Sequence, residues 1–100
     1  MKKKEIKYAF SEPKYYQEVQ DYIDSTYGQH YGQGIQTAEY IMSHSFSPDF
    51  FTGNVMAYMA RYGRKDGYNR MDILKALHFC YMLLYWHDSK VKGEKDALAT

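Results

Sequence analysis

The chain has 100 residues, of which 45% are hydrophobic and 25% charged, so a disordered polyelectrolyte and a two-lobed enzyme are both excluded. Thirteen lysines and arginines oppose twelve acids, and the net charge of +1 argues against a polycation that coats nucleic acid. Aromatic residues reach 18%, with 12 tyrosines, whose rings can pack or bind while the hydroxyl stays hydrogen-bonded. We expect a single helical domain over residues 1–100.

Cysteine content and hydropathy predict the cellular compartment in which the protein is found. Cys80 is the only cysteine, so no intramolecular disulfide can form, and no cysteine and histidine spacing predicts a zinc site. No apolar run reaches membrane-spanning length, and the first residues are too polar for a signal peptide. We therefore expect a soluble cytosolic protein with no membrane partner and no bound structural metal.

The first helix is predicted over residues 12–27. Residues 1–10 form a basic segment that we expect to be extended, and Ser11 then precedes Glu12 and Pro13, which is typical of a helix start. Gly28 is expected to end the helix. Apolar and aromatic side chains recur at steps of three and four, and they predict a core-facing stripe of Tyr15, Tyr16, Val19, Tyr22, Ile23 and Tyr27.

Two further helices are expected in the middle of the chain. Three glycines within residues 28–34 predict a loop, after which a short helix begins near Ile35 and ends between His44 and Phe46. Ser47 and Pro48 repeat the start signal, and the helix that follows is expected to run through Tyr62 until Gly63 ends it.

The final helix is predicted over residues 70–89. Asn69, with Asp72 three residues later, resembles a capping arrangement, and the helix itself is apolar on nearly every side. In so short a chain a second subunit must cover part of it, so we expect a homo-oligomer formed through this helix, with His78 packed in the core or interface. Residues 90–100 are expected to be a flexible tail. The predicted fold is an all-α, compact bundle of about four helices.

A polar ridge on the third helix is the most informative pattern. Asn54, Tyr58, Arg61 and Lys65 follow one another at steps of four, three and four, which would line one edge of a helix. Arginine and lysine close together bind phosphate, and the amide or phenol beside them can contact a base or sugar. The alternative is a solvated helix end whose cations offset the helix dipole. The cationic part of this candidate anion site comprises Arg61, Arg64, Lys65 and Arg70.

The same segment resembles a known family. The order His30-Tyr31, Gly53-Asn54, Tyr58, Arg61, Gly63-x-Lys65, Asp72 to Ala76 and Tyr81 is similar to that of the small bacteriophage nucleotide kinases. The resemblance covers residues 28–86, although Ala57 stands where many members have a basic residue. It implies a compact, oligomeric helical domain in the cytoplasm of infected bacterial cells, with a nucleotide ligand.

The resemblance also implies a role for each matching residue. His30 and Tyr31 would lie at the mouth of the site, Asn54 would hold a base edge or sugar, and Arg61 and Lys65 would bind phosphates. Asp72 would hold a metal or the Arg61 guanidinium, and Lys75 would contact a phosphate. With the neighbouring side chains, the implied ligand-binding set is His30, Tyr31, Asn54, Tyr58, Arg61, Arg64, Lys65, Asp72 and Lys75.

Each assignment has a structural alternative. His30 can be a loop histidine bonded to the backbone, Asn54 can be a helix-packing residue, and Asp72 can be a first-turn acid. Phosphoryl transfer to a deoxynucleoside monophosphate is the activity that the family name implies. No G-x-x-x-x-G-K-[ST] loop occurs in the sequence, so a kinase would have to work without a P-loop.

Three function classes therefore stay open. A kinase would need Mg²⁺, with Glu39, Asp49 and Asp72 as the carboxylates available, and its catalytic residues are not assigned. A sponge would sequester a nucleotide or a cyclic nucleotide immune signal without converting it, as a phage counter-defence protein. A third class is an interaction protein that contacts a host partner through exposed tyrosines.

Overall fold

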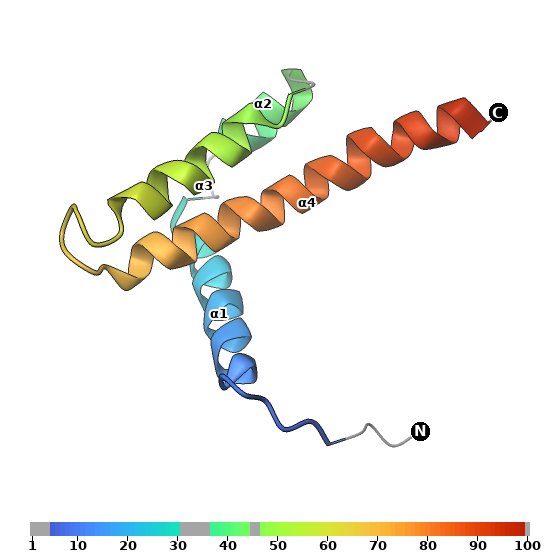
Figure 1. The fold of residues 1–100 in the computed structure, drawn as a ribbon. Coiled ribbons are helices and arrows are strands. Elements are labelled where there is room, and N and C mark those ends of the chain that lie inside the picture. Colours follow the sequence, from blue (N-terminus) through green and yellow to red (C-terminus); the bar gives the residue numbers. More distant parts are fainter. Residues whose placement is uncertain (1–4, 31–36, 45–46, 100) are drawn as a thin grey trace.

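The structure, a computed structural model, describes residues 5–30, 37–44 and 47–99, and the regular secondary structure within these ranges is α-helix alone, which confirms the predicted all-α fold. Helix α1 spans Glu12–His30, α2 Thr37–His44, α3 Asp49–Arg61 and α4 Arg70–Ala99. In Figure 1, α3 and α4 form an antiparallel hairpin and α1 crosses α4 steeply. No helix in the described ranges is long and apolar enough to cross a membrane.

The helix starts follow the predicted signals more closely than the helix ends. Pro48 occupies the N-cap of α3, and Ser47 Oγ accepts a hydrogen bond from the Asp49 amide at 3.2 Å. Helix α1 continues past Gly28 to His30, so the predicted end at residue 27 was wrong. The predicted end of the final helix at residue 89 was also wrong, because α4 continues to Ala99, while the expected flexibility of residues 90–100 stays a prediction.

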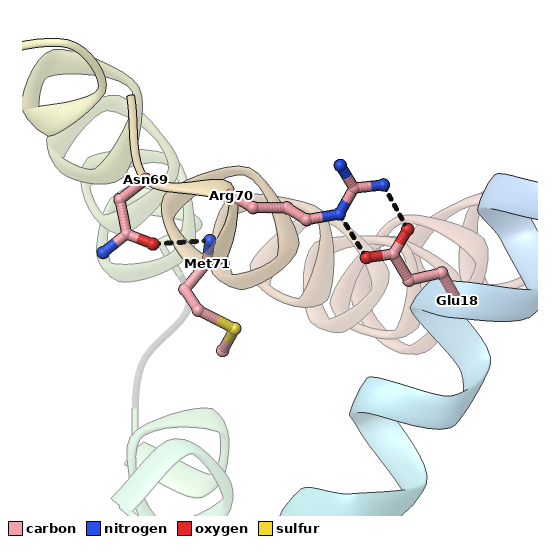
Figure 2. Close-up of polar contacts among 4 residues, drawn as sticks. All are labelled: Glu18, Asn69, Arg70 and Met71. Atoms are coloured by element: carbon pink, nitrogen blue, oxygen red, sulfur yellow. Dashed lines mark hydrogen bonds and ion pairs between the residues drawn. The ribbon is translucent and has the colours of Figure 1, made fainter. Parts of the chain in front are cut away.

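The N-cap of α4 confirms half of the predicted capping arrangement. Asn69 Oδ1 accepts a hydrogen bond from the Met71 amide at 3.0 Å, which satisfies one of the free donors of the first turn (Figure 2). Asp72 contributes its backbone amide to the Asn69 carbonyl, but its side chain lies against α3 instead of completing a capping box.

Removal of this cap should destabilise the hairpin measurably. We expect Asn69→Ala to lower the free energy of unfolding by about 1 kcal/mol, because the Met71 amide loses its side-chain acceptor. Urea unfolding followed by circular dichroism measures the change. Asn69→Asp, which keeps an oxygen acceptor, is the matched control and should be close to wild type; equal losses in both variants would contradict a capping role.

The hydrophobic core lies where α1 and α3 meet the first half of α4. Val19, Phe51, Leu74 and Ala76 are the buried apolar residues of the described ranges, and Phe51 is only 1% exposed. The predicted stripe of α1 is core-facing in part: Val19 is buried and Tyr22 is half-buried, whereas Tyr15, Tyr16 and Tyr27 are 44%, 53% and 60% exposed. A single chain therefore covers only the centre of its helices.

A bidentate ion pair fastens α1 to the start of α4. The Arg70 guanidinium donates through Nε and Nη2 to the two carboxylate oxygens of Glu18 (Figure 2). This pairing lowers the pKa of Glu18 and raises that of Arg70, because each charge stabilises the other. The N-terminal segment adds one contact, in which Tyr16 Oη donates to Tyr8 Oη at 3.3 Å.

Candidate functional site

Two cations from different helices meet at one aromatic ring. The Arg61 guanidinium carbon lies 5.6 Å from the Tyr58 ring centroid, and Lys75 Nζ lies 5.5 Å from the same centroid. Arg61 and Tyr58 come from the last turns of α3 and Lys75 from α4, so the antiparallel hairpin brings them together. Cations within about 6 Å of a ring are attracted by its quadrupole. With Asp72, these residues form the Tyr58 cluster.

Asp72 is the buried carboxylate of the Tyr58 cluster. Its side chain is 3% exposed, and Oδ1 lies 3.6 Å from Arg61 Nε, which is an ion pair but too long for a good hydrogen bond. Asp72 Oδ2 and Arg61 Nε are both buried without a hydrogen-bond partner in the described part of the chain. Buried polar atoms are usually hydrogen-bonded, so the cluster has capacity for a further polar group.

A small cavity opens beside Lys75, between α1, α3 and α4. It encloses about 180 Å³, and aromatic rings form much of its wall. Tyr58 stacks on Phe79 with ring centroids 6.0 Å apart, and Tyr22 meets His78 edge-on at 5.9 Å. The side chains that line it are Tyr22, Thr26, Tyr58, Lys75, His78, Phe79 and Met82. Such walls suit a planar aromatic group held next to a cation.

His78 connects this cavity to a larger one between α1, α2 and α4. The larger cavity encloses about 400 Å³, within the range typical of small-molecule sites, and shares His78 and Met82 with the smaller one. Its other walls are Ile23, Tyr27, Glu39, Met42, Tyr81 and Tyr85. His78 is 8% exposed, which confirms its prediction as a packed histidine.

The stability of the protein should depend on pH through His78. Burial lowers the pKa of His78 below its ordinary value of 6.5, so the unfolded chain binds this proton more readily than the folded one. The free energy of unfolding should therefore fall as pH decreases below about 6.5, and the loss should level off below the folded pKa. Glu18, whose pKa is lowered, adds its own loss only below about 4.5.

Urea unfolding at about pH 7.5 and pH 5.0 measures this dependence. We expect His78→Phe to unfold with a smaller difference between the two pH values than wild type. The control is His87→Gln, which alters an exposed histidine on the same helix and should keep the wild-type difference. The same pH dependence in wild type and His78→Phe would show that other groups cause it.

Not all of the predicted site residues converge. Tyr58, Arg61, Asp72 and Lys75 come together, whereas Asn54 uses its amide nitrogen to donate to the Phe50 carbonyl within α3 at 2.7 Å. That bond agrees with the helix-packing alternative for Asn54. The side chain of His30, whose backbone ends α1, and all of Tyr31 lie outside the described part of the chain.

The predicted ridge does not extend to Lys65, and this prediction was wrong. Helix α3 ends at Arg61, and the amides of Arg64 and Lys65 both donate to the Arg61 carbonyl in the turn that follows. The turn depends on Gly63, whose φ of 81° suits glycine and whose missing Cβ would lie 2.8 Å from Tyr68 Cε1. Arg64 and Lys65 are exposed in this turn.

The carboxylates named for magnesium do not gather in one place. Asp49 is exposed at the start of α3, Glu39 lies on α2 at the larger cavity, and Asp72 is buried near the opposite end of α3. No group of three acidic, histidine or cysteine side chains that could hold a metal occurs in residues 5–30, 37–44 and 47–99. Asp72 instead contacts Arg61, as one of its two predicted roles required.

Sequence reasoning missed the aromatic walls of the two cavities as parts of a site. Tyr22 was interpreted as a core residue and His78 as a core or interface residue, and Phe79 was considered only as part of the apolar final helix. A signal was available, since His78, Phe79 and Met82 follow Lys75 at steps of three, four and seven and so share its side of the helix. Which helix would face them depends on tertiary packing, which that spacing does not encode.

The fold and the Tyr58 cluster thus define a small helical domain with cations and aromatic cavities at the junction of its helices. The chain belongs to the DUF3310 family, described as proteins of unknown function, whose family model matches residues 25–81. The matched segment contains every predicted site residue, from His30 to Lys75, and the α3–α4 hairpin up to Tyr81. No curated protein and no solved structure matches the chain.

Proposed function

We propose that this protein binds a phosphorylated nucleotide at the Tyr58 cluster. The observation that carries the proposal is the meeting of Arg61 and Lys75 on the Tyr58 ring, with Asp72 as the one acid of the cluster. Arg61 can hold phosphate oxygens through its fork and Lys75 through its point charge. The resemblance to the bacteriophage nucleotide kinases, noted from the sequence, supports the same ligand class and a location in infected bacterial cytoplasm.

The base of the nucleotide would enter the aromatic cavity beside Lys75. Tyr58, Phe79 and Tyr22 offer ring faces and edges within that cavity, and stacking on such rings tolerates different bases. Phosphates would stay nearer to Arg61, whose side chain is 38% exposed. This arrangement leaves the ligand partly open to solvent, which suits either turnover or simple sequestration.

Calorimetry with nucleoside mono- and triphosphates and cyclic dinucleotides tests the proposal. Lys75→Met keeps the aliphatic stem and removes the charge, so we expect it to weaken binding by about tenfold to a hundredfold, as for a lost charge-assisted bond. Lys65→Met is the matched control, because Lys65 is exposed in the turn and lies off the cluster. Binding that survives Lys75→Met unchanged would place the site elsewhere, and no binding at all would favour the interaction-protein alternative.

Chemical conversion of the nucleotide distinguishes a kinase from a sponge. A kinase would convert a deoxynucleoside monophosphate to its diphosphate in a Mg²⁺-dependent manner, whereas a counter-defence sponge would return its ligand unchanged. Chromatography of each protein and nucleotide mixture distinguishes these outcomes. If the protein is a kinase that acts at the Tyr58 cluster, Asp72→Asn should abolish the rate and spare affinity, whereas Glu39→Gln, at the larger cavity, should keep the rate; in a sponge both changes should matter little.

Self-association is the second part of the proposal. A folded monomer of 11.9 kDa exposes about 5,950 Å² on the usual scaling, whereas this chain exposes 8329 Å². Part of this surface lies on α4, where the apolar side chains of Leu77, Leu84 and Tyr85 are 37%, 64% and 65% exposed. A homo-oligomer formed through α4 would cover part of this surface.

A further inference from the structure

The surface of α4 that faces away from α3 is apolar along several turns. Ile73, Leu77, Tyr81 and Leu84 follow one another at steps of four, four and three, and they are 38%, 37%, 47% and 64% exposed. Tyr85, at 65% exposed, widens this surface, which we call the α4 face. Soluble monomers seldom leave a continuous apolar strip of this length uncovered, and strips with this spacing pack against another helix.

A groove adjoins the N-terminal half of the α4 face. It encloses about 200 Å³ between α1 and α4, and its walls are mainly apolar, with the Glu18–Arg70 ion pair at one end. The residues that line it are Tyr15, Glu18, Val19, Arg70, Ile73, Leu74 and Leu77. One part of the surface is therefore hollow, and another part, at Leu84, projects.

We propose that a second copy of this chain packs its α4 face against the first in antiparallel orientation, forming a symmetric dimer. A two-fold axis at the level of residue 79 places Leu77 opposite Tyr81 of the second copy and Ile73 opposite Tyr85. The same axis places Leu84 at the level of Leu74, which lines the groove. Each copy would then insert its projecting leucine into the hollow of the other.

The charges at the two ends of the α4 face select this orientation. Arg70 and Asp88 lie at equal distances from residue 79 along the helix, so the antiparallel dimer brings each arginine opposite the second copy's aspartate. Arg70 binds Glu18 through Nε and Nη2 only, which leaves further N–H donors for a second carboxylate. A parallel dimer would instead place Arg70 opposite Arg70 and Asp88 opposite Asp88, which is repulsive.

Light scattering and sedimentation of the full chain test the dimer, and these measurements do not depend on nucleotide binding. We expect wild type to be dimeric at micromolar concentration and Leu84→Glu to raise the dimer dissociation constant by at least about tenfold, because a charge would enter an apolar groove. The matched control is Met56→Glu, which changes a residue of α3 that is 71% exposed, and it should leave the dimer intact. Circular dichroism of each variant verifies that the helices persist.

Asp88→Arg tests the orientation without disturbing a contact within one copy. In the antiparallel dimer it places arginine opposite Arg70, so the dissociation constant should rise; in a parallel dimer it would only replace one like-charge pair by another and leave affinity unchanged. Cross-linking gives a second readout. With Cys80→Ser as background, Leu77→Cys pairs have an axial offset of about 6 Å in the antiparallel dimer and Leu84→Cys pairs about 15 Å.

A bismaleimide that is long enough to span the Leu77→Cys pair across the two helices, and shorter than about 15 Å, should therefore link Leu77→Cys and not Leu84→Cys. Equal cross-linking at both positions would overturn the antiparallel orientation. A wild-type protein that stays monomeric, or a dimer that Met56→Glu dissociates and Leu84→Glu does not, would overturn the α4 face as the interface. The dimer deepens the self-association proposed above and does not rest on the nucleotide site, so absence of nucleotide binding with the dimer intact would refute only the nucleotide-binding part of that proposal.

Discussion

Replacement of Phe51 by alanine is expected to lower the free energy of unfolding by about 3–5 kcal/mol, because the ring is 1% exposed and its removal leaves a cavity. Small domains are stabilised by roughly 5–15 kcal/mol in total, and this one has only four buried apolar residues in its described ranges. The variant should therefore lose a large share of its total stability. Urea unfolding at fixed protein concentration, followed by far-ultraviolet circular dichroism, measures the loss.

The neighbouring phenylalanine provides the control. Phe50 is half-buried and contacts Phe51 and Phe79 at ring distances of 5.3 Å and 5.9 Å. Phe50→Ala should cost clearly less than Phe51→Ala, because part of its ring already faces water. If both variants lost the same stability, the core would not be centred on Phe51.

Arg61→Met is expected to destabilise the fold by about 2–3 kcal/mol, because it leaves the Asp72 carboxylate buried without a counter-charge. This loss is smaller than the roughly 3–5 kcal/mol that follows removal of one partner from a fully buried ion pair, since Arg61 is 38% exposed and water already screens part of its charge. Methionine retains the packing of the aliphatic part of the arginine side chain, so the loss of stability measures the effect of removing the positive charge. The unfolding free energy of the purified variant is the measurement.

A double variant distinguishes this electrostatic cause from lost packing. Asp72→Asn removes the buried charge at nearly constant shape, so Arg61→Met combined with Asp72→Asn should recover at least half of the lost stability. Additive losses in the double variant would show that Asp72 does not depend on Arg61. Such a result would also remove the reason for treating the Tyr58 cluster as one electrostatic unit.

The sequence predicted where helices begin better than where they end. Ser47, Pro48 and Asn69 act on the first turn that follows them, and the structure has α3 and α4 starting at those signals. Gly28 was expected to end the first helix and the final helix was expected to end at residue 89, but α1 and α4 continue through Gly28 and Gly93. Glycine within a helix costs only about 1 kcal/mol, and the lysine, glutamate and alanine residues around Gly93 are strong helix formers that offset it.

Only those contacts of the site that join residues of the same helix could be predicted, because they follow from helical spacing. Tyr58 and Arg61, three residues apart on α3, lie together as predicted, and the extension to Lys65 failed because Gly63 turns the chain away. Lys75 entered the prediction through family resemblance, and its place at Tyr58 depends on how α4 packs on α3. The contribution of α1 to the cavity depends on a crossing of helices that no local pattern encodes.

The connectivity of the helices implies an order of events in unfolding. Helices α3 and α4 are joined by the short turn 62–69, whereas the Arg70–Glu18 ion pair that fastens α1 bridges a separation of 52 residues. Contacts between near neighbours in the chain form early, and those with large sequence separation form late. Amide hydrogens of α1 should therefore exchange with solvent through partial openings that leave the α3–α4 hairpin closed. Because Tyr22 and Thr26 on α1 wall the cavity beside Lys75, each such opening would also expose that cavity.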